Sequence, residues 1–151
     1  MIKIICVGKL KENYLKEAVL EYTKRLSKYT KISIIELNDV SNTDVNTIIK
    51  KEQDEILKNV DLKDYIITLD INGQNISSTE FANKLSNTFI SFSNITFIIG
   101  GSYGLSDKIK ELSNYRLSFS KLTFPHQLFR VMLLEQIYRA FKINNNEEYH
   151  K

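Results

Sequence analysis

The chain of 151 residues has no tryptophan, one proline, one cysteine and five glycines. With Cys6 as the single cysteine no internal disulfide can form, so the sequence predicts a fold held by packing in a reducing compartment. The low proline and glycine contents exclude a collagen-like or low-complexity chain. No apolar run approaches the roughly 18 residues of a membrane span, and the apolar start at residues 2–8 is too short for a secretory signal. We therefore expect a cytoplasmic protein without a membrane-spanning segment.

Hydrophobic residues make up 42% of the chain, which is enough to bury a core in a domain of this length. The net charge of +3 is too small to indicate a nucleic-acid binder by itself. The excess is confined to residues 115–151, where six lysines and arginines accompany three acids, while residues 1–114 carry 15 of each sign. This placement leaves two interpretations open, an anionic partner near the C-terminal quarter or an ordinary solvated surface.

Short apolar segments alternate with amphipathic segments along the chain. Residues 2–8, "IKIICVG", are rich in β-branched side chains and end in glycine, which is typical of a buried strand. Residues 12–29 repeat apolar side chains every three or four positions, which predicts an amphipathic helix. The same patterns predict further strands at residues 31–39, 64–70, 94–100 and 115–119, and further helices at 43–60, 77–90, 105–112 and 125–142.

Candidate helix caps and the order of the elements define the expected architecture. Thr43 is a plausible cap for the helix at 43–60, which has a strongly charged face, and Ser77 with Glu80 forms a capping-box pattern. Strands that are apolar on both faces and alternate with helices predict a mostly parallel α/β sheet flanked by helices on both sides. No repeat, low-complexity tract or linker divides the chain, so a single domain is expected over residues 1–151.

Three of the expected strands end in segments rich in polar and turn-forming residues. These segments are residues 69–73, 100–104 and 118–123. Because ligands of parallel α/β sheets bind beyond the carboxyl ends of the strands, the three segments could converge on one pocket. The glycines of "IIGGSYGLS" would let a ligand approach the backbone closely, but a tight turn explains them equally well. Their spacing matches neither a P-loop nor the dinucleotide-binding motif.

Other common site chemistries find little support in the sequence. The segment "LDINGQ" lacks the acid that would complete a calcium loop, so Asp70 and Gly73 are expected to shape a turn. One cysteine and two distant histidines argue against zinc, and Cys6 is expected to be an inert core residue. No Gly-x-Ser-x-Gly elbow indicates a serine hydrolase. We therefore expect no metal site.

The segment at residues 125–142 is apolar around nearly its whole circumference. A helix of this kind must be buried on more than one side, which in a chain this short points to a second copy as the partner. Pro125 suits the first position of such a helix. His126 and Arg130 lie four residues apart on one face, and Arg139 lies near the other end.

The C-terminal "EEYHK" supplies an aromatic ring, Tyr149, and a side chain that titrates near neutral pH, His150. Together with "FIIGGSYGLS" and "LSFSKLTFPHQLFRVMLLEQIYRAFK", the terminal "YHK" closely resembles the ribosomal RNA large subunit methyltransferase H family of the SPOUT class. The likeness spans the full chain and includes the opening "IKIICVGK" and the central "TLD".

The resemblance implies a homodimer of SPOUT-type α/β domains with a deep trefoil knot over about residues 66–142 and a tail at 143–151. It implies S-adenosylmethionine as cofactor and N3 of pseudouridine 1915 in 23S ribosomal RNA, on assembled ribosomes, as substrate. The cofactor residues that it implies are Leu69, Gly101, Ser120, Lys121, Leu122, Thr123, Phe124 and Pro125. It further implies Arg139, Tyr149 and His150 for RNA binding and catalysis, with His126 and Arg130 shaping the site.

One departure from the family concerns the tail, where Asn146-Glu147-Glu148 replaces a turn that usually resembles Gly-x-Pro. The missing proline and the added negative charge leave the pose of Tyr149 and His150 open. Two other functions remain as alternatives. One is a non-catalytic, ribosome-associated binding protein of the same fold, and the other is a SPOUT methyltransferase that acts on transfer RNA.

Overall fold

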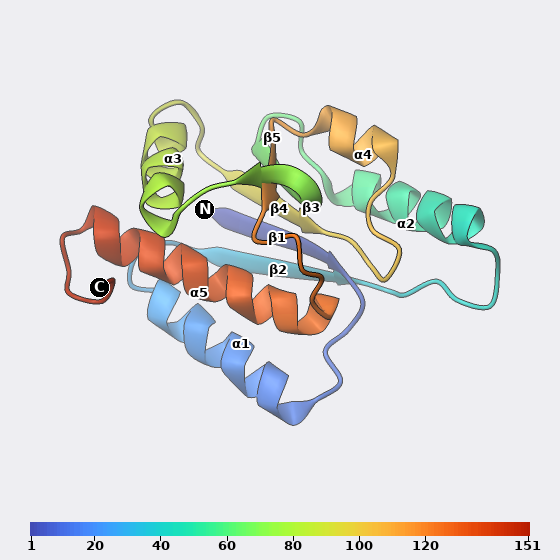
Figure 1. Ribbon diagram of the computed structural model, residues 1–151, viewed down its shortest axis with the longest axis horizontal. Coiled ribbons are helices and arrows are strands. Elements are labelled where there is room, and N and C mark those ends of the chain that lie inside the picture. Colours follow the sequence, from blue (N-terminus) through green and yellow to red (C-terminus); the bar gives the residue numbers. More distant parts are fainter.

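Five parallel strands form a single sheet in the order β2-β1-β4-β3-β5 (Figure 1). The computed structural model describes residues 1–151. The strands are β1 (Ile2–Val7), β2 (Ile32–Leu37), β3 (Tyr65–Asn75), β4 (Ile95–Ile99) and β5 (Tyr115–Ser118). All five lie where the sequence predicts strands, and the expected parallel α/β sheet is confirmed.

β1 and β4 form the centre of the sheet and carry its most deeply buried side chains. Ile4 of β1 is in register with Ile34 of β2 on one side and with Phe97 of β4 on the other. Ile4 and Phe97 are fully buried, whereas β2, at the edge, is mostly half-buried. Cys6 is also fully buried, and burial raises the pKa of its thiol to about 11, so it is the inert core residue that the sequence predicts.

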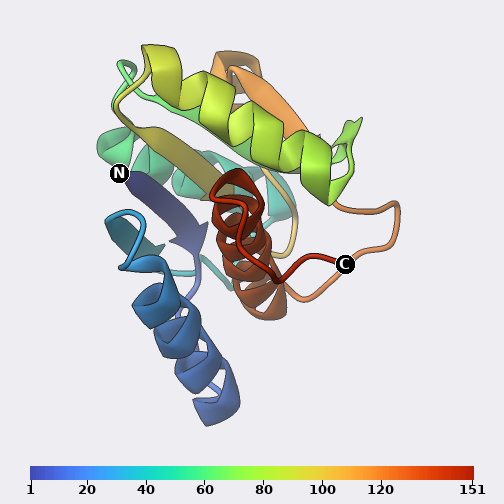
Figure 2. The same cartoon turned by 90° about the vertical axis from the view of Figure 1, so that its left-hand side faces the viewer.

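Helices cover both faces of the sheet, as strands that are apolar on both faces require (Figures 1 and 2). The face with the larger core is covered by α1 (Asn13–Leu26), α3 (Ser78–Ser91) and α5 (His126–Asn144). The other face is covered by α2 (Val45–Asn59) and α4 (Asp107–Leu112). α5 contacts both α1 and α3 and lies between them, so the last helix is central to the larger core.

The caps of α2 and α3 test the expected helix starts. Ser77 caps α3 as predicted, because its hydroxyl accepts a hydrogen bond from the backbone N–H of Glu80 at 3.1 Å. The prediction for α2 was wrong by one residue. Asp44, and not Thr43, accepts the backbone N–H of Thr47 at 3.0 Å. A carboxylate at this position also interacts favourably with the positive end of the helix dipole.

β3 is longer than the sequence predicts, because the strand resumes after a bulge. Leu69 and Gln74 both pair with Leu117 of β5, so the four intervening residues loop out of the ladder. The close approach of the two strands requires Gly73, since a Cβ there would lie 2.7 Å from the backbone of Arg116. The prediction that the strand ends near residue 70 was therefore wrong, whereas the predicted turn is present.

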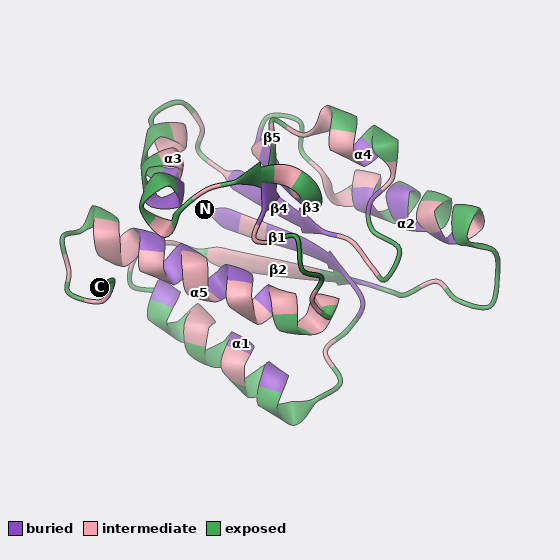
Figure 3. Ribbon diagram, viewed as in Figure 1, coloured by how far each residue is buried: buried purple, intermediate pink, exposed green.

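The apolar circumference of α5 is largely used within one protomer. Leu133, Leu134 and Ile137 are fully buried in the larger core. Figure 3 shows buried segments recurring along α5. The ring of Tyr138 packs edge-on against Tyr22 of α1, at 6.2 Å between centroids. Contacts of α5 with the sheet and with two flanking helices thus account for most of the buried positions. The second copy and the trefoil knot stay predictions. No helix is long and apolar enough to cross a membrane.

Candidate functional site

Loops at the carboxyl edge of the sheet enclose a cavity of about 770 Å³. Its walls come mainly from residues 69–72 in the β3 bulge, residues 99–105 after β4, and the segment 117–126 that connects β5 to α5. The prediction that these three segments converge on one pocket is confirmed, although the first of them is a bulge within β3 and not the end of the strand. The glycine cluster is therefore both a tight turn and a wall of the cavity.

Seven of the eight residues that the family resemblance assigns to the cofactor line this cavity. They are Leu69, Gly101, Ser120, Leu122, Thr123, Phe124 and Pro125. The eighth, Lys121, belongs to the same loop, but it is exposed and does not line the cavity. The fold brings the assigned residues together, and their contact with a cofactor stays a prediction.

The turn after β4 exposes its backbone to the cavity because it is built from glycine. Gly101 and Gly104 form a short antiparallel bridge, in which the N–H of Gly104 donates to the carbonyl of Gly101 at 3.1 Å. Gly104 has a φ of +80°, a conformation that side-chain-bearing residues rarely adopt. A Cβ on Gly100 would lie 2.9 Å from the carbonyl carbon of Gly104. These constraints keep side chains out of this wall.

The loop between β5 and α5 is fixed by its own serines. The hydroxyl of Ser118 donates to the carbonyl of Ser120 at 3.1 Å, and the hydroxyl of Ser120 accepts the N–H of Leu122 at 3.0 Å. Pro125 then stands at the start of α5 with a φ of −55°, and its carbonyl accepts the first intrahelical bond, from Phe129. The loop thus enters the helix in one defined conformation and leaves its remaining backbone groups free to face a ligand.

Asp70 shapes the floor of the cavity, as the sequence predicts for a turn residue. Its Oδ1 accepts the backbone N–H of Asn72 at 3.0 Å, which closes an Asx turn. The opposite oxygen lies 3.8 Å from Nζ of Lys110 on α4, and the Asp70 side chain is only 4% exposed. Asp70 is therefore engaged by the protein.

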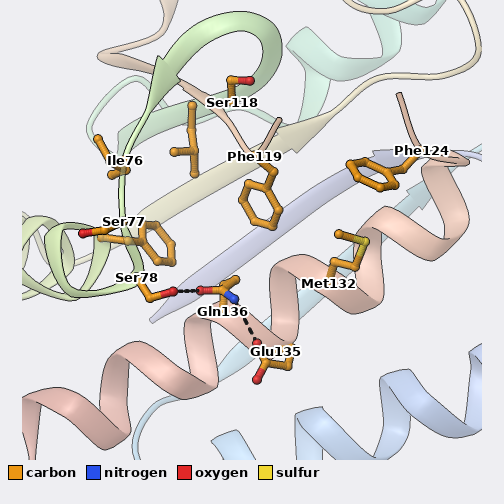
Figure 4. A pocket seen from close by; sticks show the side chains of 11 residues that line it. Ile76, Ser77, Ser78, Ser118, Phe119, Phe124, Met132, Glu135 and Gln136 are labelled. Atoms are coloured by element: carbon orange, nitrogen blue, oxygen red, sulfur yellow. Dashed lines mark hydrogen bonds between the residues drawn. The ribbon is translucent and has the colours of Figure 1, made fainter. Parts of the chain in front are cut away.

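A second cavity, of about 410 Å³, lies between the start of α3 and the middle of α5 (Figure 4). Phe119 and Phe124 line both this cavity and the larger one. Its polar wall is a chain of side chains, in which Ser78 donates to Gln136 Oε1 at 2.8 Å and Gln136 donates to Glu135 Oε2 at 3.1 Å. Sequence reasoning missed this polar wall, because its members come from separate helices and match no local motif.

His126 and Arg130, which the sequence places on one face, differ in their surroundings. His126 lines the larger cavity, and its buried Nε2 has no hydrogen-bond partner. Arg130 is 1% exposed and does not line the cavity, and its guanidinium donates to Glu36 Oε2 at 2.6 Å and to the carbonyl of Gly8 at 2.8 Å. The expectation that both face the same cleft was therefore wrong for Arg130. Arg130 could therefore affect the cavity only indirectly, through its hydrogen bonds to Gly8, after β1, and to Glu36 of β2.

Arg139, Tyr149 and His150 lie together near the C-terminal end of α5. Nη2 of Arg139 donates to Glu135 Oε1 at 2.6 Å, and Nη1 donates to Nδ1 of His150 at 3.2 Å. The guanidinium carbon also lies 4.8 Å from the ring centroid of Tyr149, within cation–π range. The family resemblance assigns these three residues to one role, and the structure brings them into contact.

Glu135 connects this group, and sequence reasoning missed it. The hydroxyl of Tyr149 donates to Glu135 Oε1 at 3.0 Å. Burial and this hydrogen bond raise the pKa of Tyr149 to about 12, so its hydroxyl stays protonated at neutral pH. The hydrogen bond to Glu135 also raises the pKa of Arg139. The spacing of four residues between Glu135 and Arg139 was the available signal for their ion pair.

The unusual tail is held by charge pairs and a left-handed turn. Asn146 adopts a φ of +55° and turns the chain back after α5. Glu147 then accepts the hydroxyl of Tyr29 at 2.9 Å and pairs with Lys142 at 2.7 Å. The negative charge that departs from the family pattern is therefore an anchor, and it sets where the following Tyr149 lies.

The Arg139 group and the glycine-lined cavity occupy different parts of one protomer. His126, at the cavity, begins α5, and Arg139 follows 13 residues later. At about 1.5 Å per residue this spacing separates the two positions by roughly 20 Å along the helix axis. Figure 1 shows the chain terminus near the end of α5 that lies away from the β5–α5 loop. No group of three or more His, Cys, Asp or Glu side chains is arranged to hold a metal ion.

An all-parallel sheet with a glycine-lined cavity at its carboxyl edge is the arrangement in which α/β domains usually bind small ligands. The chain belongs to the SPOUT methyltransferase family, because the family model described as "Predicted SPOUT methyltransferase" matches residues 1–150. It is 55% identical over 157 aligned positions to the ribosomal RNA large subunit methyltransferase H of Clostridium tetani. The enzyme of that name from Clostridium botulinum strain Alaska E43 is likewise 55% identical. Each alignment covers 99% of both proteins.

Solved structures with low sequence identity share the fold. A "probable methylase family protein" from Haemophilus influenzae Rd KW20 superposes with a TM-score of 0.57 at 17% identity, over 99% of this chain and 70% of that one. The tRNA (m1G37) methyltransferase of Aquifex aeolicus gives the same TM-score at 13% identity, over 91% of this chain and 69% of that one. At these identities the likeness shows the fold alone.

Proposed function

We propose that this chain is an S-adenosylmethionine-dependent enzyme that methylates N3 of pseudouridine 1915 in 23S ribosomal RNA, on assembled ribosomes. One observation carries the proposal. Residues from three separate segments, which the family resemblance assigns to the cofactor, line one cavity. The chain that contains them aligns over 99% of its length with ribosomal RNA large subunit methyltransferases H.

The cavity fits the proposed cofactor in size and lining. Its volume of about 770 Å³ lies within the range of roughly 300–1,000 Å³ that is usual for ligand sites. Leu69 and Phe124 offer apolar contact, while Gly101 and the loop from Ser120 to Pro125 offer backbone groups for a purine edge. When bound, S-adenosylmethionine supplies a methyl group on a cationic sulfonium sulfur.

The Arg139 group suits the proton chemistry of a pyrimidine nitrogen. N3 of the base carries a proton, so a proton acceptor or cationic stabilisation of the deprotonated ring is needed. Arg139 would stabilise the anionic ring, and the aromatic face of Tyr149 would stack on a base. His150 would accept the proton at Nδ1, the atom that Arg139 now occupies, once the guanidinium turns to the ring.

The separation within one protomer supports a composite site in a homodimer. If two copies of α5 ran antiparallel across a two-fold axis, the Arg139 group of one protomer would face the cavity of the other. The mouth of the cavity also exposes apolar side chains that a partner would cover. Ile71 is 44%, Tyr103 54% and Leu122 72% exposed. A dimer thus accounts both for these exposed side chains and for the distance of roughly 20 Å along α5.

The charge of the chain fits a substrate that is presented on a larger surface. A net charge of +3 gives a protomer few phosphate contacts, so it would hold free RNA weakly. Single-stranded or loop nucleotides on an assembled ribosome expose a base for recognition by shape and stacking. The basic excess in residues 115–151 would contribute the phosphate contacts.

Methyl transfer from labelled S-adenosylmethionine tests the proposal. The protein is incubated in parallel with whole ribosomes, isolated large subunits and transfer RNA, and the modified position is mapped by mass spectrometry. We expect label in 23S ribosomal RNA at the N3 atom of one pseudouridine. Label in transfer RNA would overturn the substrate in favour of the tRNA-directed alternative. Calorimetry without any S-adenosylmethionine binding would instead favour the non-catalytic binding protein.

A further inference from the structure

Glu52 of α2 is a buried carboxyl group that the proposed chemistry does not use. The residue is 6% exposed, and its Oε2 has no hydrogen-bond partner. Its two carboxyl oxygens lie 2.8 and 2.9 Å from the point where a Cβ on Gly101 would be. Gly101 lines the larger cavity and Glu52 does not, so Glu52 lies next to one residue of the wall of the proposed cofactor site.

No cationic side chain is paired with Glu52, whose pKa is affected only by burial and by Asp39. Val7 of β1, which lies 3.2 Å from the same Gly101 Cβ position, is apolar. Asp39, after β2, is the charged group that acts on Glu52, and it is also negative. His126 of α5 approaches Asp39 across Gly8, since atoms of both lie about 3 Å from the position of a Gly8 Cβ.

Lys108 of α4, the element packed against α2, acts on the exposed Asp54 and not on Glu52. Burial, and then the charge of Asp39, raise the pKa of Glu52 to about 7. A buried, unpartnered carboxyl group is destabilising, and an apolar residue at this position of α2 would avoid the cost. Its presence under a ligand-binding wall therefore calls for a functional explanation.

We propose that Glu52 determines cofactor specificity by charge: its carboxylate beneath Gly101 favours the cationic sulfonium of S-adenosylmethionine over the neutral thioether of the product S-adenosylhomocysteine. The inference rests on the proposed function. Opposite unit charges that are separated by a single backbone segment in a partly buried site attract each other strongly. This attraction is enough to change the ratio of the two ligand affinities about tenfold. The same preference would speed release of the product, which has lost the positive charge.

The proposal requires proton linkage of a definite sign. Binding of a cation stabilises the ionised form of Glu52 and so lowers its pKa, which releases part of a proton near pH 7. Binding of the neutral product releases none from this group. Because the pKa of Glu52 is raised to about 7, the preference for the cation is present at pH 8 and is lost as the pH falls to 6.

Titration calorimetry with three ligands tests the proposal. The ligands are S-adenosylmethionine, S-adenosylhomocysteine and sinefungin, which carries an ammonium group near the sulfonium position. The variant is Glu52→Gln, which keeps the shape and removes the charge. The control is Glu55→Gln on the same helix, where the carboxyl is 48% exposed and pairs with Lys58. Proton release is measured in parallel on the unaltered protein, in buffers of different ionisation enthalpy.

At pH 8 we expect the affinity ratio of S-adenosylmethionine to S-adenosylhomocysteine to fall about tenfold in Glu52→Gln and to stay unchanged in Glu55→Gln. Sinefungin should follow S-adenosylmethionine. The ratio should drop severalfold between pH 8 and pH 6 in the unaltered protein and stay flat in Glu52→Gln. A pH dependence of this ratio that persists in Glu52→Gln would show that another group causes it and would overturn the proposal.

Two further outcomes are decisive. If Glu52→Gln fails to fold, proton release on ligand binding to the unaltered protein decides. Equal release by the cationic and the neutral ligand overturns the inference, and greater release by the cationic ligand supports it. If neither S-adenosylmethionine nor its product binds the unaltered protein, the proposed function itself fails. If both bind and their ratio ignores Glu52, only the charge preference is wrong.

Discussion

Glu135 and Tyr149, 14 residues apart, are joined by a hydrogen bond of 3.0 Å that the tyrosine hydroxyl donates to Oε1. The same oxygen accepts a charge-assisted hydrogen bond of 2.6 Å from Arg139. One carboxylate therefore fixes both the guanidinium and the tail. The side chains proposed to handle the substrate are positioned by a residue that itself lines the second cavity.

Replacing this carboxylate should damage turnover more than cofactor binding. In Glu135→Ala both Arg139 and Tyr149 lose their shared partner, so we expect the rate of methyl transfer to ribosomes to fall about 10- to 100-fold, or about 1.4 to 2.8 kcal/mol of positioning. The affinity for S-adenosylmethionine should change less than twofold. The exposed Glu148→Ala serves as the control, and a normal rate in Glu135→Ala would remove Glu135 from the positioning of this group.

His150 should be essential for the chemical step. We expect His150→Ala to abolish methylation, because the proposed proton acceptor is lost, while calorimetry shows intact cofactor binding. The neighbouring Lys151→Ala should keep its activity and so controls for a general disturbance of the tail. Unchanged turnover in His150→Ala would exclude this residue from the mechanism.

The anchor of the tail should weaken in acid. Hydrogen bonds from Lys142 and Tyr29 hold the pKa of Glu147 below its ordinary value of 4.5. A depressed pKa means that the anchor is complete above about pH 4.5 and is lost as the pH falls through the lowered value. We expect limited proteolysis to remove residues 147–151 faster below that pH. Glu147→Gln should be cleaved readily even at pH 7, and cleavage of both proteins at one constant rate would contradict the anchor.

Much of this architecture could be predicted from local sequence. The exceptions all depend on contacts between residues that are far apart in the sequence. Runs rich in Ile located β1, β2, β3 and β4, because strands buried in a parallel sheet need no pattern beyond apolar side chains, whereas β5 has neither Ile nor Val. The extension of β3 was missed since it depends on contact between Gly73 and the backbone of Arg116. Glu52 sits in a helix with a strongly charged face, and only the packed fold shows it to be buried.

The group of residues around Arg139 likewise combines a feature that the sequence indicates with one that only the fold shows. The family resemblance singles out Arg139, Tyr149 and His150, but their common partner Glu135 emerges only when the chain turns back at Asn146. Arg130 and His126 share a helix face and both approach Gly8, but only His126 lines the cavity. The guanidinium of Arg130 is held by the Gly8 carbonyl and by Glu36 instead. Such long-range contacts leave no trace in periodicity or spacing.

Arg130 should matter for stability more than for chemistry. Arg130→Met keeps the apolar stem but leaves the Gly8 carbonyl without its guanidinium donor and Glu36 without its charge partner. Breaking a fully buried ion pair costs about 3–5 kcal/mol, and because the Glu36 side chain is 36% exposed we expect a loss of about 2 kcal/mol. Urea unfolding measures it. Glu36→Gln should lower the free energy of unfolding less, since Arg130 keeps its hydrogen bond to the Gly8 carbonyl. A larger loss in Glu36→Gln than in Arg130→Met would contradict the structural role of Arg130.

Two glycines that bracket the cavity should respond differently to alanine. At Gly73 a Cβ would lie 2.7 Å from the backbone of Arg116, which cannot move without displacing β5. We expect Gly73→Ala to cost about 2–3 kcal/mol of unfolding free energy and to weaken cofactor binding, because the β3 bulge forms a wall of the cavity. Gly104 has open space around its Cβ position, and only its φ of +80° is unfavourable for alanine. Gly104→Ala should therefore cost about 1–2 kcal/mol. If Gly73→Ala and Gly104→Ala lose the same unfolding free energy in denaturant, the β3 bulge can shift to accept a Cβ. In that case the spacing of β3 and β5 does not define the cavity.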